Sequence, residues 1–189
     1  MKRNLYIALA ALVVFVLTAC QATPATPTLT RTSGNEFFQD QPGRWISVRP
    51  PAGWVAKPGG SNISPTIILT DDWKGYQQSD GKAIGITILP LADKGSAEQV
   101  LQIAIGRLKG SLAQPAGEVK LEQVGNQSYA SVEYNGLSVE AGGESAYYFL
   151  AVVATDQRSV LVFISTTMPD QQEHIRSAFQ KAVKAITLH

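Results

Sequence analysis

Short connections between β-rich runs restrict how this chain can fold. Four such runs follow one another in its second half, at residues 118–124, 128–134, 146–155 and 159–165. Parallel neighbours need a crossover of a dozen or more residues, so these runs are predicted to pair antiparallel. Asn135-Gly136 is the strongest hairpin signal, because a type I′ turn requires positive φ at both central positions. We therefore expect a turn there, with residues 137–140 as the return strand.

The first half of the chain adds further β-rich runs at residues 44–49, 66–70 and 83–89. The run 147–154 is apolar at every position, although an antiparallel strand with one wet face would alternate. Both faces of the sheet must therefore be covered around this strand. The sequence predicts an α+β fold, with a mostly antiparallel sheet of about six to seven strands flanked by two helices.

Two segments carry helical patterns. Ser96 and Gln99 form a capping box, and apolar residues follow at helical spacing up to Leu108. A second helix is predicted to begin near Asp170, with Glu173 completing a second capping pattern and an apolar face from 175 to 186. One helix on each face would give an α/β/α sandwich. The alternative is a two-layer packing with both helices on one side.

The first twenty residues follow the pattern of an export signal. A short basic segment precedes an apolar stretch of about fifteen residues, which is shorter than a membrane-spanning helix. The sequence Leu17-Thr18-Ala19-Cys20 resembles the bacterial lipobox. The resemblance implies cleavage before Cys20 and attachment of acyl chains to it, and two chains would hold a protein stably at a membrane. The alternative is an ordinary secretory signal with an incidental cysteine.

The residues after Cys20 are rich in threonine, proline and alanine, which is typical of a linker. We therefore expect a signal peptide at 1–19, a lipidated tether at 20–43 and a single domain at 44–189. Phe37 and Phe38 interrupt the tether. We expect them to dock onto the domain, with membrane contact as the alternative.

The segment Ile46-Ser47-Val48-Arg49-Pro50-Pro51-Ala52-Gly53-Trp54 takes an early strand into a Pro-x-Gly-Trp corner. Together with the order of strands and helices after it, this segment resembles the PsbP-like fold. That group includes PsbP, the Ran-binding Mog protein and bacterial lipoproteins of the LpqN type. The resemblance implies a non-enzymatic accessory or binding role at a membrane surface.

The sequence offers few residues for catalysis or metal binding. It contains a single cysteine and two histidines, His174 and His189, without metal-ligand spacing, and no nucleotide-binding or nucleophile-elbow motif. The segment holding Asp71, Asp72, Trp73 and Tyr76 could form a carbohydrate site, in which acids act on glycosidic oxygens and aromatic rings stack on sugars. The interpretation that we favour is a polar turn with one aromatic residue packed as a lid.

These features favour a lipid-anchored accessory or binding module on the extracytoplasmic face of the cell membrane. It would hold an envelope protein or component, and we expect neither catalysis nor a cofactor. The first alternative is a carrier or sensor of a small apolar ligand between sheet and helix, and the second is an envelope hydrolase using Asp71 or Asp72. We expect no nucleic-acid partner, because the formal net charge is only +1 and no basic stripe is present.

Overall fold

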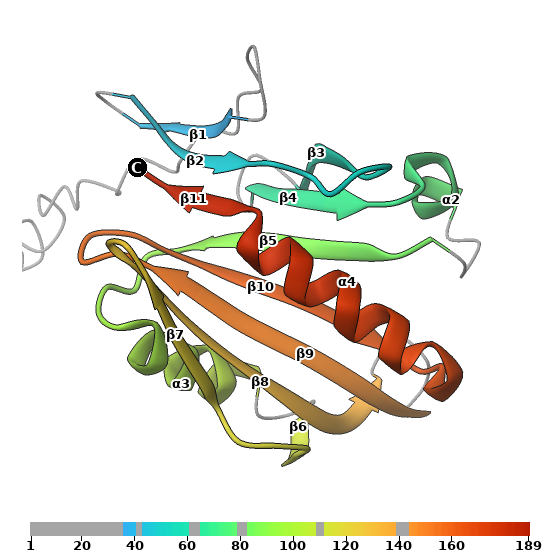
Figure 1. Ribbon diagram of the computed structural model, residues 1–189. Coiled ribbons are helices and arrows are strands. Elements are labelled where there is room, and N and C mark those ends of the chain that lie inside the picture. Colours follow the sequence, from blue (N-terminus) through green and yellow to red (C-terminus); the bar gives the residue numbers. More distant parts are fainter. Residues whose placement is uncertain (1–35, 41–42, 61–64, 79–82, 109–111, 139–143) are drawn as a thin grey trace, which may run out of the picture.

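The computed structural model describes residues 36–189, apart from 41–42, 61–64, 79–82, 109–111 and 139–143 (Figure 1). The predicted signal peptide, Cys20 and residues 20–35 of the predicted tether lie outside the described residues. Within them, an eight-stranded antiparallel sheet forms the body of the protein. Its strands, in spatial order, are β3 (Val55–Gly60), β4 (Pro65–Thr70), β5 (Gly85–Leu91), β10 (Ser159–Thr166), β9 (Glu144–Ala154), β8 (Gln127–Ser138) and β6 (Leu112–Pro115), with β7 (Lys120–Val124) also paired to β8.

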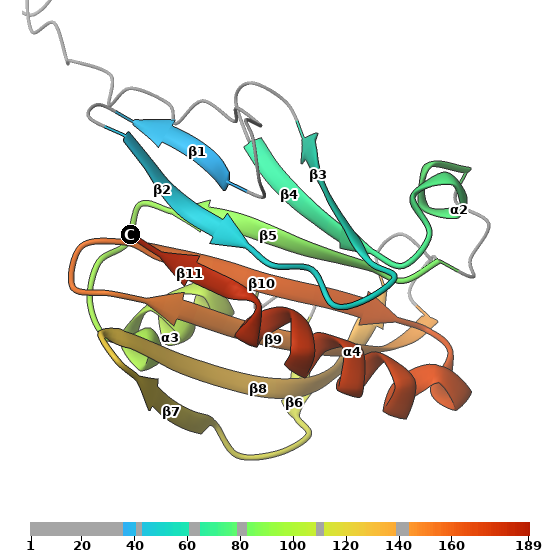
Figure 2. The same ribbon diagram turned by 45° about the horizontal axis from the view of Figure 1, so that its top comes forward.

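A second sheet of three strands brings the two ends of the described chain together. It consists of β1 (Glu36–Asp40), β2 (Gly43–Val48) and β11 (Ile186–Leu188), in the order β1-β2-β11. Phe37 pairs with Ile46, and Ile186 pairs with Val48. Figure 2 shows this small sheet on the same side of the main sheet as the last helix.

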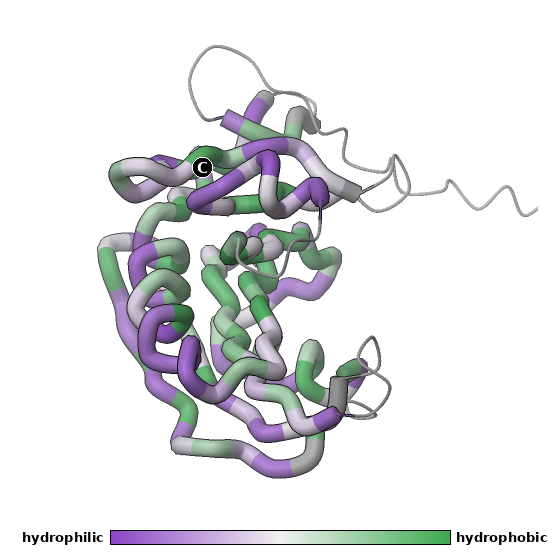
Figure 3. Tube along the Cα trace, turned by 90° about the vertical axis from the view of Figure 1, so that its right-hand side faces the viewer, coloured by the Kyte–Doolittle hydropathy of each residue, from purple (hydrophilic) through white to green (hydrophobic). Residues whose placement is uncertain are grey.

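The helices are α2 (Trp73–Gln78), α3 (Ala97–Leu108) and α4 (Gln172–Lys184), and a 3-10 turn, η1 (Pro169–Gln171), precedes α4. α4 packs on β9 and β10, while α3 packs on β8, β9 and β10. The small sheet and α4 share one buried cluster, and α3 belongs to another. Figure 3 shows the hydrophobic residues concentrated along the strands in the interior.

Strand β9 explains why both faces of the sheet are covered. Phe149, Ala151 and Val153 belong to the cluster under α4, whereas the alternate residues Leu150, Val152 and Ala154 belong to the cluster under α3. All six are at most 1% exposed, as the unbroken apolar run required. The predicted α+β fold and the α/β/α arrangement are confirmed, and the two-layer alternative is wrong.

The number of strands differs from the prediction. The main sheet alone has eight strands instead of six or seven, and the small sheet adds three more. The strands that the sequence analysis missed are short or poor in β-forming residues. β3 has the sequence VAKPGG, β6 is LAQP and β11 is only three residues long. Proline and glycine weaken the strand signal, so tertiary pairing decides their structure.

The predicted hairpin turn at Asn135-Gly136 is wrong. Both residues continue β8, where Asn135 pairs with Tyr147 and Gly136 with Ala146. Gly136 is buried and is not among the residues with positive φ. The residues predicted as a return strand therefore begin as the end of β8, and 139–140 lie outside the described residues. The eleven cross-strand pairs between β8 and β9 outweigh a local turn preference.

The two predicted capping boxes have different outcomes. At α3, Ser96 N–H donates to Gln99 Oε1 at 3.2 Å, and Gln99 N–H donates to Ser96 Oγ at 3.3 Å, so this box is confirmed. At α4, η1 intervenes and the N-cap is Gln171, with no side-chain hydrogen bond to the helix. The Asp170–Glu173 pattern is therefore not a cap, and Glu173 instead pairs with Arg176.

The folded domain begins before the predicted boundary at residue 44. Residues 36–40, which the sequence analysis placed in the tether, form β1. Phe37 and Phe38 are both fully buried, and the Phe38 ring stacks on Trp45 with centroids 5.5 Å apart. The expectation that the two phenylalanines dock onto the domain is confirmed, and they do so as part of a strand.

Candidate functional site

The carboxylates of the predicted Asp71–Tyr76 segment bind backbone groups. Asp72 Oδ1 accepts hydrogen bonds from Lys74 N–H at 3.0 Å and Gly75 N–H at 3.1 Å, which caps the start of α2. Asp71 Oδ1 accepts a hydrogen bond from Ile84 N–H at 3.0 Å. The two carboxylates thus serve different backbone segments, and the surface-binding role suggested for them stays a prediction.

The aromatic residues of the same segment stack on each other, and Tyr76 packs on the sheet. The rings of Trp73 and Tyr76 are stacked, with centroids 5.9 Å apart. Tyr76 also covers Gly85 at the start of β5, where an added Cβ would lie 2.1 Å from the Tyr76 ring. This arrangement agrees with the interpretation of a polar segment with one aromatic residue as a lid, although the segment is a short helix.

A cavity lies between α4 and the β7–β8 hairpin, and the sequence analysis, which offered a ligand between sheet and helix as an alternative, identified none of its lining residues. Its volume is about 650 Å³. We call it the α4–β7 groove, and its main lining residues are Lys120, Glu122, Tyr129, Ser131, Glu133, Phe149, Arg176, Phe179, Val183 and Lys184. α4 covers β9 and β10, so the part of the same face formed by β8 and β7 is left as one wall of the groove.

The floor of the groove is apolar. Phe149 on β9 and Phe179 on α4 are nearly fully buried, and their rings lie with centroids 5.9 Å apart. Val183 follows Phe179 by one helical turn and is 7% exposed. These side chains form a packed floor, and a ligand would contact only the small exposed parts of Phe179 and Val183 along α4.

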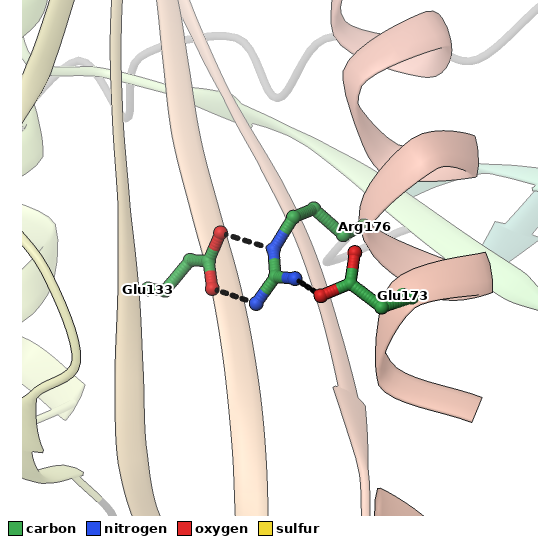
Figure 4. Close-up of polar contacts among 3 residues, drawn as sticks. All are labelled: Glu133, Glu173 and Arg176. Atoms are coloured by element: carbon green, nitrogen blue, oxygen red, sulfur yellow. Dashed lines mark hydrogen bonds and ion pairs between the residues drawn. The ribbon is translucent and has the colours of Figure 1, made fainter. Parts of the chain in front are cut away.

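A pair of hydrogen bonds spans one end of the groove (Figure 4). Arg176 Nε and Nη2 donate to the two carboxylate oxygens of Glu133, each at 2.7 Å. Arg176 Nη1 also pairs with Glu173. The hydrogen bonds to Glu133, followed by those to Glu173, raise the pKa of Arg176 above its ordinary value. The guanidinium lies 5.8 Å from the centroid of the Phe149 ring, so α4 and β8 are held together over the apolar floor.

The wall formed by β7 and β8 carries hydroxyl groups and a charge that α4 compensates. Lys184 Nζ on α4 lies 3.2 Å from Glu122 Oε1 on β7. Tyr129 Oη accepts a hydrogen bond from Gln127 Nε2 at 2.7 Å. Burial raises the pKa of Tyr129, and the hydrogen bond from Gln127 opposes this shift in part. At neutral pH the Tyr129 hydroxyl is therefore protonated and carries a proton to donate.

Gln127 fixes this wall to the small sheet. Its side chain is 5% exposed, and its Oε1 accepts a hydrogen bond from Leu188 N–H at 2.7 Å. Its Nε2 also donates to the carbonyl oxygen of Ile186 at 3.2 Å. The hairpin that lines the groove is thus attached to the C-terminal strand, which indicates a preformed site.

The groove joins residues that no sequence spacing connects. Arg176 and Glu133 are 43 positions apart, and Lys184 and Glu122 are 62 apart. The apolar face predicted for the last helix leaves Arg176 and Lys184 on its polar side, but sequence spacing gives no indication of their partners. One signal was available in the sequence, because Tyr129, Ser131 and Glu133 are polar residues at every second position of a strand.

Features typical of metal sites and membrane spans are not found in the described part of the chain. Residues 36–189, with the gaps given above, contain no group of three or more His, Cys, Asp or Glu side chains placed to hold a metal ion. His174 is exposed on α4, and His189 Nε2 lies 2.7 Å from Ser47 Oγ. Among the same residues, no helix combines the length and hydrophobicity needed to cross a bilayer.

Comparison with known proteins gives similarity at the level of solved structures. No protein-family model matches the sequence, and no curated protein shows significant similarity to it. LpqN of Mycobacterium tuberculosis, described as involved in cell envelope biogenesis, is 18% identical with a TM-score of 0.48, over 76% of this chain and 82% of LpqN. The cyanobacterial PsbP of Synechocystis sp. PCC 6803 is 14% identical with a TM-score of 0.49, over 92% of this chain and 99% of that protein.

A third similar structure is a protein from Bacteroides thetaiotaomicron VPI-5482, which is 10% identical with a TM-score of 0.43, over 77% of this chain and 45% of that protein. LpqN and PsbP both belong to the group that the sequence resembles. With identities below 20% and TM-scores below 0.5, these similarities carry no functional conclusion for this chain.

Proposed function

We propose that this chain is a lipid-anchored, extracytoplasmic binding module that holds an envelope protein or component near the cell membrane, with the α4–β7 groove as its binding site. The observation that supports this proposal most directly is the groove itself. Its volume of about 650 Å³ lies within the range of ligand sites, and an apolar floor lies between walls of compensated charge. Such a surface binds by hydrophobic contact and gains specificity from hydrogen bonds.

The membrane location depends on Cys20 in this proposal. Acylation of Cys20 would hold the module at the membrane, and the residues between Cys20 and β1 would form the tether. The anchor is tested by intact mass analysis of the mature protein from a bacterial host and by fractionation of a Cys20→Ala variant. We expect a diacylated N-terminal Cys20 and loss of the variant from the membrane fraction. An unmodified N-terminus at another residue would contradict the anchor and leave the groove proposal standing.

Binding in the groove is tested by photo-cross-linking in cells that express the full chain. A photoreactive residue at Gln180, an exposed residue of α4 that lines the groove, would capture the occupant. The matched control is the same residue at Gln102, an exposed position of α3 on the opposite side of the main sheet. We expect a reproducible product at position 180 and none at 102. Equal products at both positions, or none at either, would contradict the proposal.

A small apolar ligand is the second candidate occupant, because Phe149, Phe179 and Val183 line a cavity between helix and sheet. Native mass spectrometry of the purified full chain would show a bound species of constant mass. A Ser131→Phe variant, which adds bulk to the β8 wall, should lose this species. A protein cross-linked at position 180, together with an empty purified chain, would instead favour the envelope protein.

The hydrolase using Asp71 or Asp72 stays a prediction without support from the geometry of the described residues. Both carboxylates accept backbone hydrogen bonds that position α2 and the start of β5. An activity of the parent chain that Asp71→Asn or Asp72→Asn abolishes, while the protein remains folded, would revive it.

A further inference from the structure

We propose that the free edge of β7 pairs with β7 of a second copy of this chain, so that two main sheets join across a two-fold axis at Leu121. β7 is paired on one side with β8, and no other described strand pairs with its second edge. An open edge presents unpaired N–H and C=O groups that can bind another strand. The pairing requires no particular occupant of the α4–β7 groove, and it rests on the proposed function only for the membrane attachment that brings two copies together.

The turn between β7 and β8 determines which backbone groups point outward. Val124 pairs with Gln127, so the loop has two residues, Gly125 and Asn126. Gly125 has a φ of 59°, and Asn126 is not among the residues with positive φ, as in a type II′ turn. Such a turn makes Val124 and Gln127 a hydrogen-bonded pair. Hydrogen bonding alternates along an antiparallel pair, so Val124, Glu122 and Lys120 bond toward β8.

The intervening residues then present their N–H and C=O groups at the free edge. These are Leu121 and Gln123, followed upstream by Val119. Two copies can form hydrogen bonds across this edge only if outward residues lie opposite one another. Three antiparallel registers satisfy this condition near the centre of the strand. Leu121 can lie opposite Val119, Leu121 or Gln123 of the second copy.

Charge selects one of the three registers. With Leu121 opposite Leu121, Lys120 lies opposite Glu122 of the second copy, and by symmetry this pair occurs twice. With Leu121 opposite Val119, Lys120 lies opposite Lys120 of the second copy. With Leu121 opposite Gln123, Glu122 lies opposite Glu122. Opposite charges stabilise a cross-strand pair and like charges destabilise it. The sequence of β7, KLEQV, is therefore self-complementary in one register.

The side chains agree with the selected register. All five residues of β7 are exposed, and Leu121 and Val124 are 59% and 55% exposed. The proposed pairing brings Leu121 against Leu121 at the axis, which removes apolar surface from water. Lys120 and Glu122 line the α4–β7 groove, so each copy would add charged side chains beside the groove of the other. The pairing of two β7 strands involves few residues and would be weak in dilute solution. Confinement of both copies at a membrane would raise their effective concentration and favour the pairing.

Cysteine cross-linking distinguishes the three registers in membranes of cells that express the full chain. In the proposed register, Leu121→Cys places two Cα atoms about 5.5 Å apart, which is within disulfide range. Lys120→Cys and Glu122→Cys would each place their own copies about 8 Å apart, which is too far. We expect a disulfide-linked dimer for Leu121→Cys, and for neither neighbour nor the exposed control Gln102→Cys. Dimers at position 120 or 122 equal to those at 121 would overturn the register, and no dimer at any position would overturn the pairing.

Charge reversal tests the reason for the register. In the Leu121→Cys background, Lys120→Glu and Glu122→Lys each place like charges opposite one another, and the double reversal restores opposite charges. We expect each single reversal to weaken dimer formation roughly tenfold and the double reversal to recover most of it. Equal yields in all four backgrounds would contradict the role of charge. If the double reversal also lost the dimer while its circular dichroism spectrum was unchanged, that result would likewise contradict the role of charge.

Discussion

Arg176 holds α4 against β8 through two hydrogen bonds that no other described residue duplicates at this end of the groove. Both Arg176 and Glu133 have side chains 25% exposed, so their attraction is only partly screened. Glu173, the second acid near the guanidinium, is 84% exposed. Glu133 and Glu173 thus contact the same guanidinium, but one is half-buried and the other is exposed. Comparing variants of the two shows how much burial strengthens the contact.

We predict that Glu133→Gln lowers the free energy of unfolding by about 1–2 kcal/mol, because it weakens charge-assisted hydrogen bonds in a half-buried site. Glu173→Gln is the matched control, and an exposed ion pair should contribute less than about 0.5 kcal/mol. Urea denaturation of both variants would measure the difference. Equal losses would show that burial of Glu133 does not strengthen its contact with Arg176.

Gly85 allows α2 to lie on the main sheet. An added Cβ would lie 2.1 and 2.4 Å from two carbons of the Tyr76 ring, which is far below contact distance. We predict that Gly85→Ala destabilises the protein by about 1–3 kcal/mol through overpacking. Gly106→Ala is the control, because Gly106 lies within α3 with no atom near the added methyl group, and it should stabilise by about 0.5–1 kcal/mol.

The Gly85 prediction can be separated from a backbone effect by thermal unfolding of a double variant. In a Tyr76→Ala background the clash is absent, so Gly85→Ala should cost much less there. The same cost in both backgrounds would mean that Tyr76 is not the cause. The sequence indicated that one aromatic residue of the segment 71–76 acts as a lid, but it identified neither Tyr76 as that residue nor Gly85 as the residue it covers, since strand pairing and not spacing brings the two together.

At the scale of elements, local signals predicted structure where no long-range pairing opposed them. The Ser96–Gln99 box begins α3 as the sequence indicated, because its hydrogen bonds lie within four residues. Asn135-Gly136 carried an equally clear local signal, yet β9 and β6 pair with those residues and keep them in β8. Pairing with two neighbouring strands is not readable from a turn motif, which is why this element was mispredicted.

The contrast between the two helix starts leads to a prediction about capping. Ser96→Ala should lower the free energy of unfolding by about 1 kcal/mol, because the N–H of Gln99 loses its acceptor. Asp170→Ala, at the start of the pattern that proved not to be a cap, should change it by less than about 0.5 kcal/mol. Urea denaturation measures both. A larger loss for Asp170→Ala would show that this residue stabilises α4 despite the intervening turn.

At the scale of the whole molecule, the sequence predicted the layers but not the closure of the domain. The unbroken apolar run of β9 indicated cover on both faces, and α3 and α4 supply it. The small sheet was missed because its strands come from both ends of the domain, and β11 is only three residues long. The residues of the groove could not be predicted because they depend on where α4 and β7 lie across the sheet.

The position of β1 leads to a prediction about where the folded domain begins. Phe37 is fully buried in the cluster that α4 and the main sheet share, and Glu36 and Phe37 pair with Ser47 and Ile46 of β2. Phe37→Ala should therefore lower the free energy of unfolding by about 3–5 kcal/mol, as for other buried aromatic residues. This loss is a large part of the total for a domain of ordinary stability. A tether residue would show no such effect.

The control for this experiment is Val55→Ala on β3, since Val55 is 38% exposed and its truncation should cost less than about 1 kcal/mol. Both variants are compared with the parent chain by urea denaturation, followed by circular dichroism. A loss for Phe37→Ala no larger than that for Val55→Ala would place the domain boundary after β1, as the sequence analysis did. The predicted larger loss would make β1 part of the cooperative fold. The tether proposed from Cys20 would then end before Glu36, and the proposed reach from the membrane would be shorter than a boundary at residue 44 implies.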